Sequence, residues 1–153
     1  MTTQLILVNP KDVPDVWVNA KPLIDKALAY SEGNMTAYDA LKLILNERQQ
    51  LWVGVTESKI TCTGLTEIIH YPQNKILRIV TFATDSGQDL NIWQNHLHVV
   101  EEFGVACGCN RLEAWTRKGL AEKLQWEHEY AVITKEIKPK QQRKRRRRSK
   151  QNG

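Results

Sequence analysis

One segment constrains the fold of this chain more than any other. In residues 75–109 an apolar, strand-like stretch, KILRIVTFA, passes through the loop TDSGQD into a long helix-like stretch, LNIWQNHLHVVEEFGVAC. The first backbone N–H groups of a helix have no partner within the helix and carry the positive end of its dipole, so an anion can bind there. The segment therefore predicts a strand followed by a helix, and their junction is a candidate anion site.

Three apolar stretches predict the centre of a sheet. They are LWVGVT at 51–56, ITCTGLTEIIHY at 60–71 and KILRIVTFA at 75–83. The loops between them have three residues each, and connections this short join antiparallel neighbours. We therefore predict an antiparallel meander, with a short first strand at 5–8 and a last strand at 129–137.

Two helices are predicted before the meander. Apolar residues recur at helical spacing from Asp12 to Leu28, and Pro22 is expected to kink or divide this helix. Thr36 and Asp39 have the spacing of a capping box, with Asp in place of the usual Glu, so a second helix should begin there and end near Arg48. Its apolar face is predicted to comprise Ala40, Leu41, Ile44 and Leu45.

The long helix also predicts the elements after it. Gly108 is suited to the position just after the helix end, where a left-handed backbone is common. If the connection is a right-handed crossover, residues 109–115 form a strand parallel to 75–83. A short helix over 116–124 should come next. This order predicts an α/β (α+β) fold with a mixed, mostly antiparallel sheet and helices on both faces.

Composition excludes several classes. No run of about 18 apolar residues occurs, and the N-terminus lacks a basic segment before its short apolar run, so neither a membrane span nor a signal peptide is expected. Cys62, Cys107 and Cys109 are too few for a disulfide framework and are predicted to be buried thiols. No metal site is expected, because C-x-C without a second paired cluster is a weak zinc pattern.

Charge divides the chain at residue 137. Nine of the 22 basic residues and none of the 17 acidic residues lie in 138–153, so the preceding part carries a net negative charge. The segment contains no aliphatic or aromatic side chain, and we predict a disordered basic tail in 138–153 beside one domain in 1–137. The nine side chains predicted to bind nucleic-acid phosphates are Lys138, Lys140, Arg143, Lys144, Arg145, Arg146, Arg147, Arg148 and Lys150.

Other roles for this tail stay open. It could act as a solubilising segment, dock on the acidic domain of its own chain, or serve as a nuclear-import signal, since all of these use the same composition.

The order of elements and several short motifs carry a resemblance to a known family. The layout resembles that of GNAT-type N-acetyltransferases. More narrowly, LWVGV after the second helix, TEI in the next strand, a Trp early in the long helix, GC before the next strand, and RKGLAEKLQW are similar to GNAT-like proteins of tailed bacteriophages. The resemblance covers about residues 10 to 137 and implies a bacterial host cytoplasm or a phage virion as the location.

The resemblance implies where acetyl-CoA would bind. In the family, the strand that corresponds to 75–83 pairs with the pantetheine arm, which assigns Val80 and Phe82 to the cofactor. A following glycine-rich loop holds the pyrophosphate, which assigns Ser86, Gly87 and Gln88. A cleft between separated strands near Phe82 and Arg111 would also be required.

The loop departs from the family pattern, however. Only Gly87 of the pattern is kept, the Arg or Gln that opens the family loop is absent, and Asp85 and Asp89 would repel a phosphate. Asp89 or Ser86 could instead accept hydrogen bonds from the first N–H groups of the helix as a cap.

The family also uses a base that takes a proton from the acceptor amine, and Glu67 matches best. It lies between Thr66 and Ile68 in an apolar strand, where desolvation would raise the pKa of its carboxyl. His70 is the second candidate. Alternatively, Glu67 is a solvent-facing residue or an ion-pair partner of Arg78 on the adjacent strand. His96 is predicted to be a hydrogen-bonded, partly buried residue.

Two functions from different classes follow. The first is an acetyl-CoA-dependent N-acetyltransferase whose tail brings it to nucleic acid. The second is a non-catalytic GNAT-fold protein with a structural, virion-associated or host-interaction role in a phage, which binds DNA through its tail.

Overall fold

The computed structural model describes residues 2–29, 34–86, 89–114, 126 and 135–137. The chain divides into two units, Met1–Lys118 and Gly119–Gly153. All the helices and strands described lie in the first unit. The predicted short helix at 116–124, the last strand at 129–137 and the tail from residue 138 fall largely or wholly outside the described residues.

The first unit is built on one five-stranded sheet. The strands are β1 (Thr3–Leu7), β2 (Gln50–Thr56), β3 (Lys59–His70), β4 (Lys75–Thr84) and β5 (Arg111–Ala114), and they lie side by side in chain order. The first four are antiparallel to their neighbours, while β5 is parallel to β4. The predicted meander and the predicted parallel strand are both confirmed.

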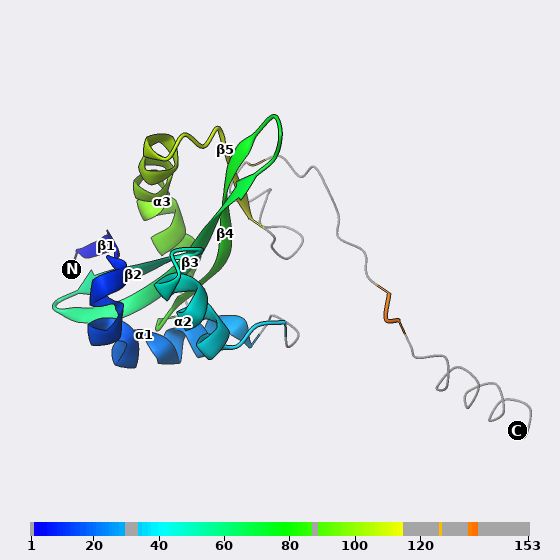
Figure 1. Cartoon of the computed structure of the whole chain (residues 1–153). Helices are drawn as coiled ribbons and strands as arrows, with labels where there is room; N and C mark the ends of the chain where they lie inside the picture. The colour runs from blue at the N-terminus through cyan, green and yellow to red at the C-terminus, as the bar shows by residue number, and fades with distance from the viewer. Residues whose placement is uncertain (1, 30–33, 87–88, 115–125, 127–134, 138–153) are drawn as a thin grey trace, which may run out of the picture. The chain divides into compact units, whose positions relative to one another are not determined.

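Helices lie on both faces of this sheet. A short 3-10 turn, η1 (Pro10–Asp12), leads into α1 (Val13–Leu28); α2 (Ala37–Leu45) and α3 (Asp89–Ala106) follow. Helices α1 and α2 lie on one side of the sheet and α3 on the other (Figure 1). We call these sides the α1/α2 face and the α3 face.

Each face has its own apolar core. The α1/α2 core includes the fully buried Ile24, Ile44 and Leu65, and the α3 core includes Trp52 and Leu77. Burying each of these large side chains contributes about 1.5–3 kcal/mol. The alternation of side chains along each strand supplies both cores, because successive residues point to opposite faces.

The start of α2 confirms the predicted capping box. Thr36 Oγ1 accepts a hydrogen bond from the backbone N–H of Asp39 at 3.2 Å, and the Asp39 carboxylate accepts one from the backbone N–H of Thr36 at 2.9 Å. These hydrogen bonds, first the one from the Thr36 backbone, hold the pKa of Asp39 below its ordinary value. The box satisfies N–H groups that a helix start otherwise leaves unpaired.

The β2–β3 connection is tighter than predicted. It consists of Glu57 and Ser58, both with positive φ (49° and 66°), which is the backbone that two-residue hairpin turns need. Close packing accompanies it at Gly54, where a Cβ atom would lie 2.0 Å from Cys62 Sγ. Only glycine lets these two strands approach so closely.

The connection from α3 to β5 follows the predicted crossover. Gly108 has φ 81°, the left-handed conformation expected just after a helix. The Lys75 ammonium donates to the backbone oxygen of Cys107, and the Asn110 N–H donates to the backbone oxygen of Lys75 at 2.9 Å. The turn is therefore tied to the beginning of β4, which sets β5 in parallel register.

Two of the helices differ from what the sequence predicts. Helix α1 is not divided at Pro22, because the carbonyl that proline leaves unpaired belongs to Val18, whose residue is 78% exposed and open to water. The expected kink at Pro22 stays a prediction. Helix α2 ends at Leu45 and not near Arg48, and Leu45 is 46% exposed, so it does not belong to the apolar face. The cleft expected between the strands near Phe82 and Arg111 stays a prediction, because β5 is described only to Ala114, opposite Ile79.

Candidate functional site

The two halves of β4 have different surroundings. Lys75–Ile79 is paired with β3 on one side and, from Ile76, with β5 on the other. The described part of β5 ends at Ala114, opposite Ile79. Beyond that point the residues from Val80 to Thr84 have no described strand on the β5 side. A strand edge of this kind can pair with an extended ligand.

A β-bulge marks the boundary between the halves. Ile79 lies opposite Thr66 and Thr81 lies opposite Leu65, so Val80 is an extra residue in β4. Val80 packs against the α1/α2 core, whereas Phe82 packs against the α3 core. Two predicted cofactor residues that are two positions apart thus point to opposite faces, which regular alternation would not allow.

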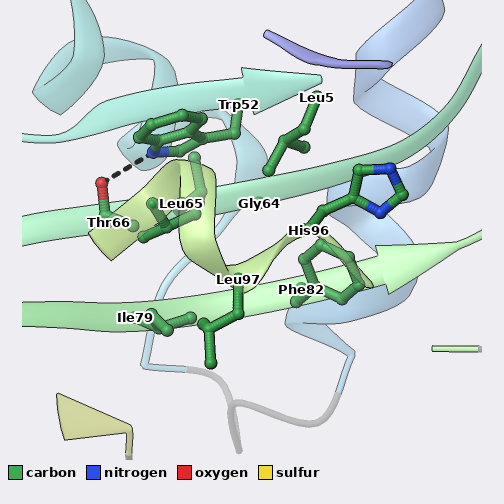
Figure 2. Close-up of a pocket in the computed structure, with 10 residues that line it drawn as sticks. Leu5, Trp52, Gly64, Leu65, Thr66, Ile79, Phe82, His96 and Leu97 are labelled. Atoms are coloured by element: carbon green, nitrogen blue, oxygen red, sulfur yellow. Dashed lines mark hydrogen bonds between the residues drawn. The ribbon is translucent and has the colours of Figure 1, made fainter. Parts of the chain in front are cut away.

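The ring of Phe82 borders a small cavity between the sheet and α3. The cavity holds about 20 Å³, roughly the space of one water molecule. Figure 2 shows the side chains around it. They are Leu5, Trp52, Gly64, Leu65, Thr66, Ile79, Phe82, His96, Leu97 and Val100. The Phe82 side chain therefore serves packing between the sheet and α3.

Hydrogen bonds hold the walls of this cavity in place. Trp52 donates through Nε1 to Thr66 Oγ1 at 3.0 Å (Figure 2). Thr66 in turn donates to Gln50 Oε1 at 2.8 Å. His96 donates through Nε2 to the backbone oxygen of Thr3 at 2.7 Å, which ties α3 to the edge strand. This contact confirms the prediction of a hydrogen-bonded, partly buried histidine at residue 96.

The described part of the loop after β4 is only partly suited to a phosphate. The backbone N–H of Asp85 already donates to the backbone oxygen of Thr61 at 2.9 Å, and the Asp85 side chain is exposed. Ser86 is exposed as well, while Gly87 and Gln88 lie outside the described residues. Helix α3 begins at Asp89, but its side chain is not among those described, so its predicted capping role stays a prediction.

One contact at this loop was not predicted from the sequence. The Lys26 ammonium, in the last turn of α1, donates to the backbone oxygen of Thr84 at 2.7 Å. A signal was present, because Lys26 has no acidic residue three or four positions away to pair with along the helix. The tertiary fold brings this cation to the end of β4.

Three charged residues form a row across β3, β4 and β5. Glu67 lies directly opposite Arg78, and Arg78 lies opposite Glu113, so all three point to the α1/α2 face. Arg78 donates through Nε to Glu113 Oε1 at 2.7 Å, and the two side chains are 18% and 30% exposed. Cβ atoms of residues directly opposite each other in an antiparallel pair lie about 4.5–5.5 Å apart.

Glu67 differs from its neighbours in this row. It is half-buried, and within the described part of the chain its carboxylate makes no hydrogen bond or ion pair, because the ion pair of Arg78 is with Glu113. The alternative prediction, an ion pair between Glu67 and Arg78, is therefore wrong. A half-buried carboxylate without a partner can accept a proton from a bound amine.

The structure does not bring His70 to Glu67. The two residues are three apart on a regular part of β3, so their side chains point to opposite faces. His70 is exposed at the end of the strand, opposite Lys75. The two candidate bases therefore belong to different surfaces and cannot act on one substrate atom.

The cysteines are not arranged as reactive groups. Cys62 is fully buried, as predicted, whereas Cys107 and Cys109 are only half-buried. Burial raises the pKa of the Cys109 thiol, although the Lys75 cation opposes this effect. In the described ranges no group of three or more His, Cys, Asp or Glu residues is placed to hold a metal ion.

Comparison with known proteins identifies the fold. No protein-family model and no curated protein sequence matches the chain. Among solved structures, the GNAT family acetyltransferase of Staphylococcus aureus subsp. aureus USA300_TCH1516 has a TM-score of 0.63 at 17% identity, over 90% of this chain and 100% of that one. This chain has a GNAT acetyltransferase fold.

Two further GNAT-fold neighbours name acceptors or a cofactor. Aminoglycoside N-acetyltransferase AAC(6')-Iy in complex with CoA has a TM-score of 0.67 at 11% identity, over 90% of this chain and 96% of that one. The ribosomal-protein-alanine N-acetyltransferase of Brucella melitensis biovar Abortus 2308 has a TM-score of 0.66 at 9% identity, over 90% and 100%. Identities this low establish the fold and leave activity to be argued from the site.

Within the GNAT fold, the strand fits acyl-CoA better than the loop does. The bulged half of β4, which has no described strand on the β5 side, is suited to an extended ligand. In the described loop, the Asp85 amide is already bonded and the Asp85 carboxylate is exposed, which opposes a pyrophosphate. None of the helices in the described part of the chain is long and apolar enough to cross a membrane.

Proposed function

We propose that the chain is an acetyl-CoA-dependent N-acetyltransferase. The observation that supports this most directly is the bulge at Val80, which separates the half of β4 that pairs with both β3 and β5 from a half with no described strand on the β5 side. Glu67, whose carboxylate has no partner among the described residues, lies on the neighbouring strand β3. The backbone of Val80 and Phe82 would hold the acyl-CoA arm. Bound there, the cofactor would supply the acetyl group as a thioester.

Glu67 is the proposed base. Val80 and Glu67 lie on adjacent strands, and both side chains point to the α1/α2 face. An acceptor ammonium on this face could give its proton to the Glu67 carboxylate, which leaves the neutral amine able to attack. Arg78 lies opposite Glu67, but its Nε donates to Glu113. The Glu67 carboxylate is therefore left without an ion pair among the described residues.

The acceptor is proposed to be a primary amine. The neighbours AAC(6')-Iy and the ribosomal-protein-alanine N-acetyltransferase are named for an aminoglycoside and for alanine, respectively, and both carry amino groups. An aminoglycoside such as sisomicin and a peptide with an N-terminal alanine are therefore the first acceptors to test. Free CoA released by the full chain can be followed by mass spectrometry.

Thermal unfolding tests whether the cofactor binds. A ligand that binds only the native state stabilises it by RT ln(1 + [L]/Kd), about 2.7 kcal/mol at 100 times the Kd. We expect acetyl-CoA to raise the Tm of the full chain, and adenosine triphosphate at the same concentration, as the control, to raise it less. An unchanged Tm at millimolar acetyl-CoA would refute the proposed activity.

One observation favours the non-catalytic alternative. The Asp85 amide is occupied and its carboxylate is exposed at the position where a pyrophosphate would bind. If acetyl-CoA has no effect, the better proposal is a GNAT-fold protein with a structural, virion-associated or host-interaction role in a phage. The proposed location is then the virion, and otherwise the bacterial host cytoplasm.

We also infer a nucleic-acid-binding role for the tail at 138–153. The support is its sequence alone, nine basic residues without an acid. Phosphate contacts of this kind weaken steeply as salt rises. Deletion of 138–153 should remove salt-sensitive DNA binding and leave the Tm nearly unchanged; DNA binding that survives the deletion would exclude this role.

A further inference from the structure

Lys26 is held at the end of β4 by a long-range contact. Its ammonium donates to the backbone oxygen of Thr84 at 2.7 Å, across 58 positions of sequence. Thr84 is the last residue of β4 and is 1% exposed, so the cation lies where the strand passes into the loop. A neutral carbonyl orders this ammonium but does not neutralise it.

Another lysine of the same helix provides a contrast. Lys21 pairs with Asp25 at 2.8 Å, one helical turn away. Lys26 makes no ion pair with any carboxylate among the residues that the structure describes. Its positive charge is therefore available to an anion, and an ammonium has three N–H donors, of which the Thr84 carbonyl takes one.

The loop that follows Thr84 lacks a cation of its own. The sequence from Thr84 to Asp89 contains no Lys or Arg, and it contributes the carboxylates of Asp85 and Asp89. A phosphate near this loop would meet net negative charge unless a cation from elsewhere compensates. Among the described residues, Lys26 is the cation whose hydrogen bond reaches the start of the loop.

We propose that Lys26 supplies, from α1, the positive charge that binds the phosphate groups of acyl-CoA at the end of β4. This role rests on the proposed function, because it requires the cofactor to lie along β4. The ammonium would either move from the Thr84 oxygen to a phosphate oxygen or donate to both oxygens at once. The cation that GNAT loops place before the glycines would then come from a helix on the α1/α2 face.

The test separates charge from hydrogen bonding. Lys26→Gln keeps an N–H donor for the Thr84 carbonyl but removes the charge, Lys26→Arg keeps both, and Lys21→Gln removes a charge that is already paired. Binding of coenzyme A to the full chain is measured by isothermal titration calorimetry, with far-UV circular dichroism as a check of folding. Lys26 is exposed, so all three variants should fold.

We expect Lys26→Gln to weaken coenzyme A binding about tenfold, since hydrogen bonds to charged groups are about twice as strong as neutral ones. Lys26→Arg should bind within about twofold of the unmodified chain, and Lys21→Gln should bind equally well. The tenfold difference should shrink at about 1 M salt, where the screening length is about 3 Å.

Two outcomes would overturn the role of Lys26 while leaving the proposed function standing. One is an unmodified chain that binds coenzyme A and a Lys26→Gln variant that binds it equally well. The other is an equal loss in Lys21→Gln, which would indicate a general charge effect. If the unmodified chain does not bind coenzyme A, the proposed function fails and the role of Lys26 fails with it.

Discussion

The first and second halves of β4 have different neighbours, although both are apolar. Lys75–Ile79 lies between two strands, and Arg78 is fixed there by its ion pair with Glu113. Val80–Thr84 begins at a bulge, lacks a described strand on the β5 side, and ends at the Lys26 contact. One strand thus combines a half that holds a charged ion pair between two strands with a half that has a described strand on one side.

One extra residue changes the use of this strand. Without the bulge, Phe82 would share the face of Val80. With it, Phe82 packs under α3 and Val80 packs on the α1/α2 face. Bulges commonly re-aim side chains and end pairing next to active sites. The first half supplies Arg78, the middle residue of the row that contains Glu67, and the second half supplies the edge proposed for the cofactor.

The largest effect is expected for Glu67, the proposed base, which lies opposite Arg78 of the first half. Glu67→Gln should lower kcat/KM for an amine acceptor by about 10²–10⁴-fold, the usual contribution of a general base. His70→Gln is the matched control, because His70 lies on the opposite face, and it should stay within about threefold. Release of CoA from acetyl-CoA measures both. A large loss in His70→Gln with an active Glu67→Gln would reverse the assignment.

The next largest effect is a difference in stability loss between substitutions in the first and second halves of β4. Leu77 is fully buried in the paired half, so Leu77→Ala should lower the free energy of unfolding by about 2–5 kcal/mol. Val80 is only partly buried in the bulge, and Val80→Ala should lower it by about 1–2 kcal/mol, because fewer contacts are lost. Urea unfolding gives both values. Equal losses would mean that the bulge packs as tightly as the paired half.

A smaller effect concerns the ion pair of the first half. The Arg78 and Glu113 side chains are partly exposed, so solvent screens their attraction. A double-mutant cycle with Arg78→Met and Glu113→Gln should give a coupling free energy of about 1 kcal/mol, reduced at high salt. A coupling near zero would indicate that register alone, without the ion pair, sets β5 beside β4.

The smallest effect is a pH dependence of the free energy of unfolding, caused by Cys109 in the connection between α3 and β5. Because burial raises the pKa of Cys109 in the folded state, the native state holds this proton more tightly than the unfolded state does. Stability is therefore fully present below the unfolded pKa and is lost as pH rises through that value toward the folded pKa. Under reducing conditions, urea unfolding between about pH 7 and pH 10 should show a smaller loss for Cys109→Ala than for the unmodified chain.

Cys107→Ala is the control for this measurement, because it leaves the Cys109 thiol in place. Identical pH profiles for the unmodified chain and Cys109→Ala would contradict the expectation. The turn near Lys75 and Cys107 would then leave the Cys109 thiol as accessible as in the unfolded chain.

Local sequence patterns predicted the described elements and their order. Period-two and helical spacing, short loops, the capping box at Thr36 and Gly108 after α3 are all local signals, and each was confirmed. The local patterns at Pro22 and Leu45 were less informative. The cost of a lost hydrogen bond or an exposed apolar side chain depends on which side of each helix meets solvent, and the tertiary structure sets that.

The site was predicted only in part, for a related reason. Val80, Phe82 and Glu67 were placed on the right strands, yet which face each side chain occupies depends on register and on one extra residue. His70 was the second candidate for the base, and its spacing of three from Glu67 puts it on the opposite face. Ser86 is exposed in the loop, and Gly87, Gln88 and the basic tail remain predictions outside the described residues.

The strands, the helices and the division of charge are encoded in the amino-acid sequence, because they depend on neighbours a few positions apart. The tertiary structure, in contrast, pairs Arg78 with Glu113, leaves Glu67 without a partner among the described residues, and brings Lys26 to Thr84. Contacts across 35 and 58 positions depend on how helices and strands pack together, and no local pattern encodes that geometry.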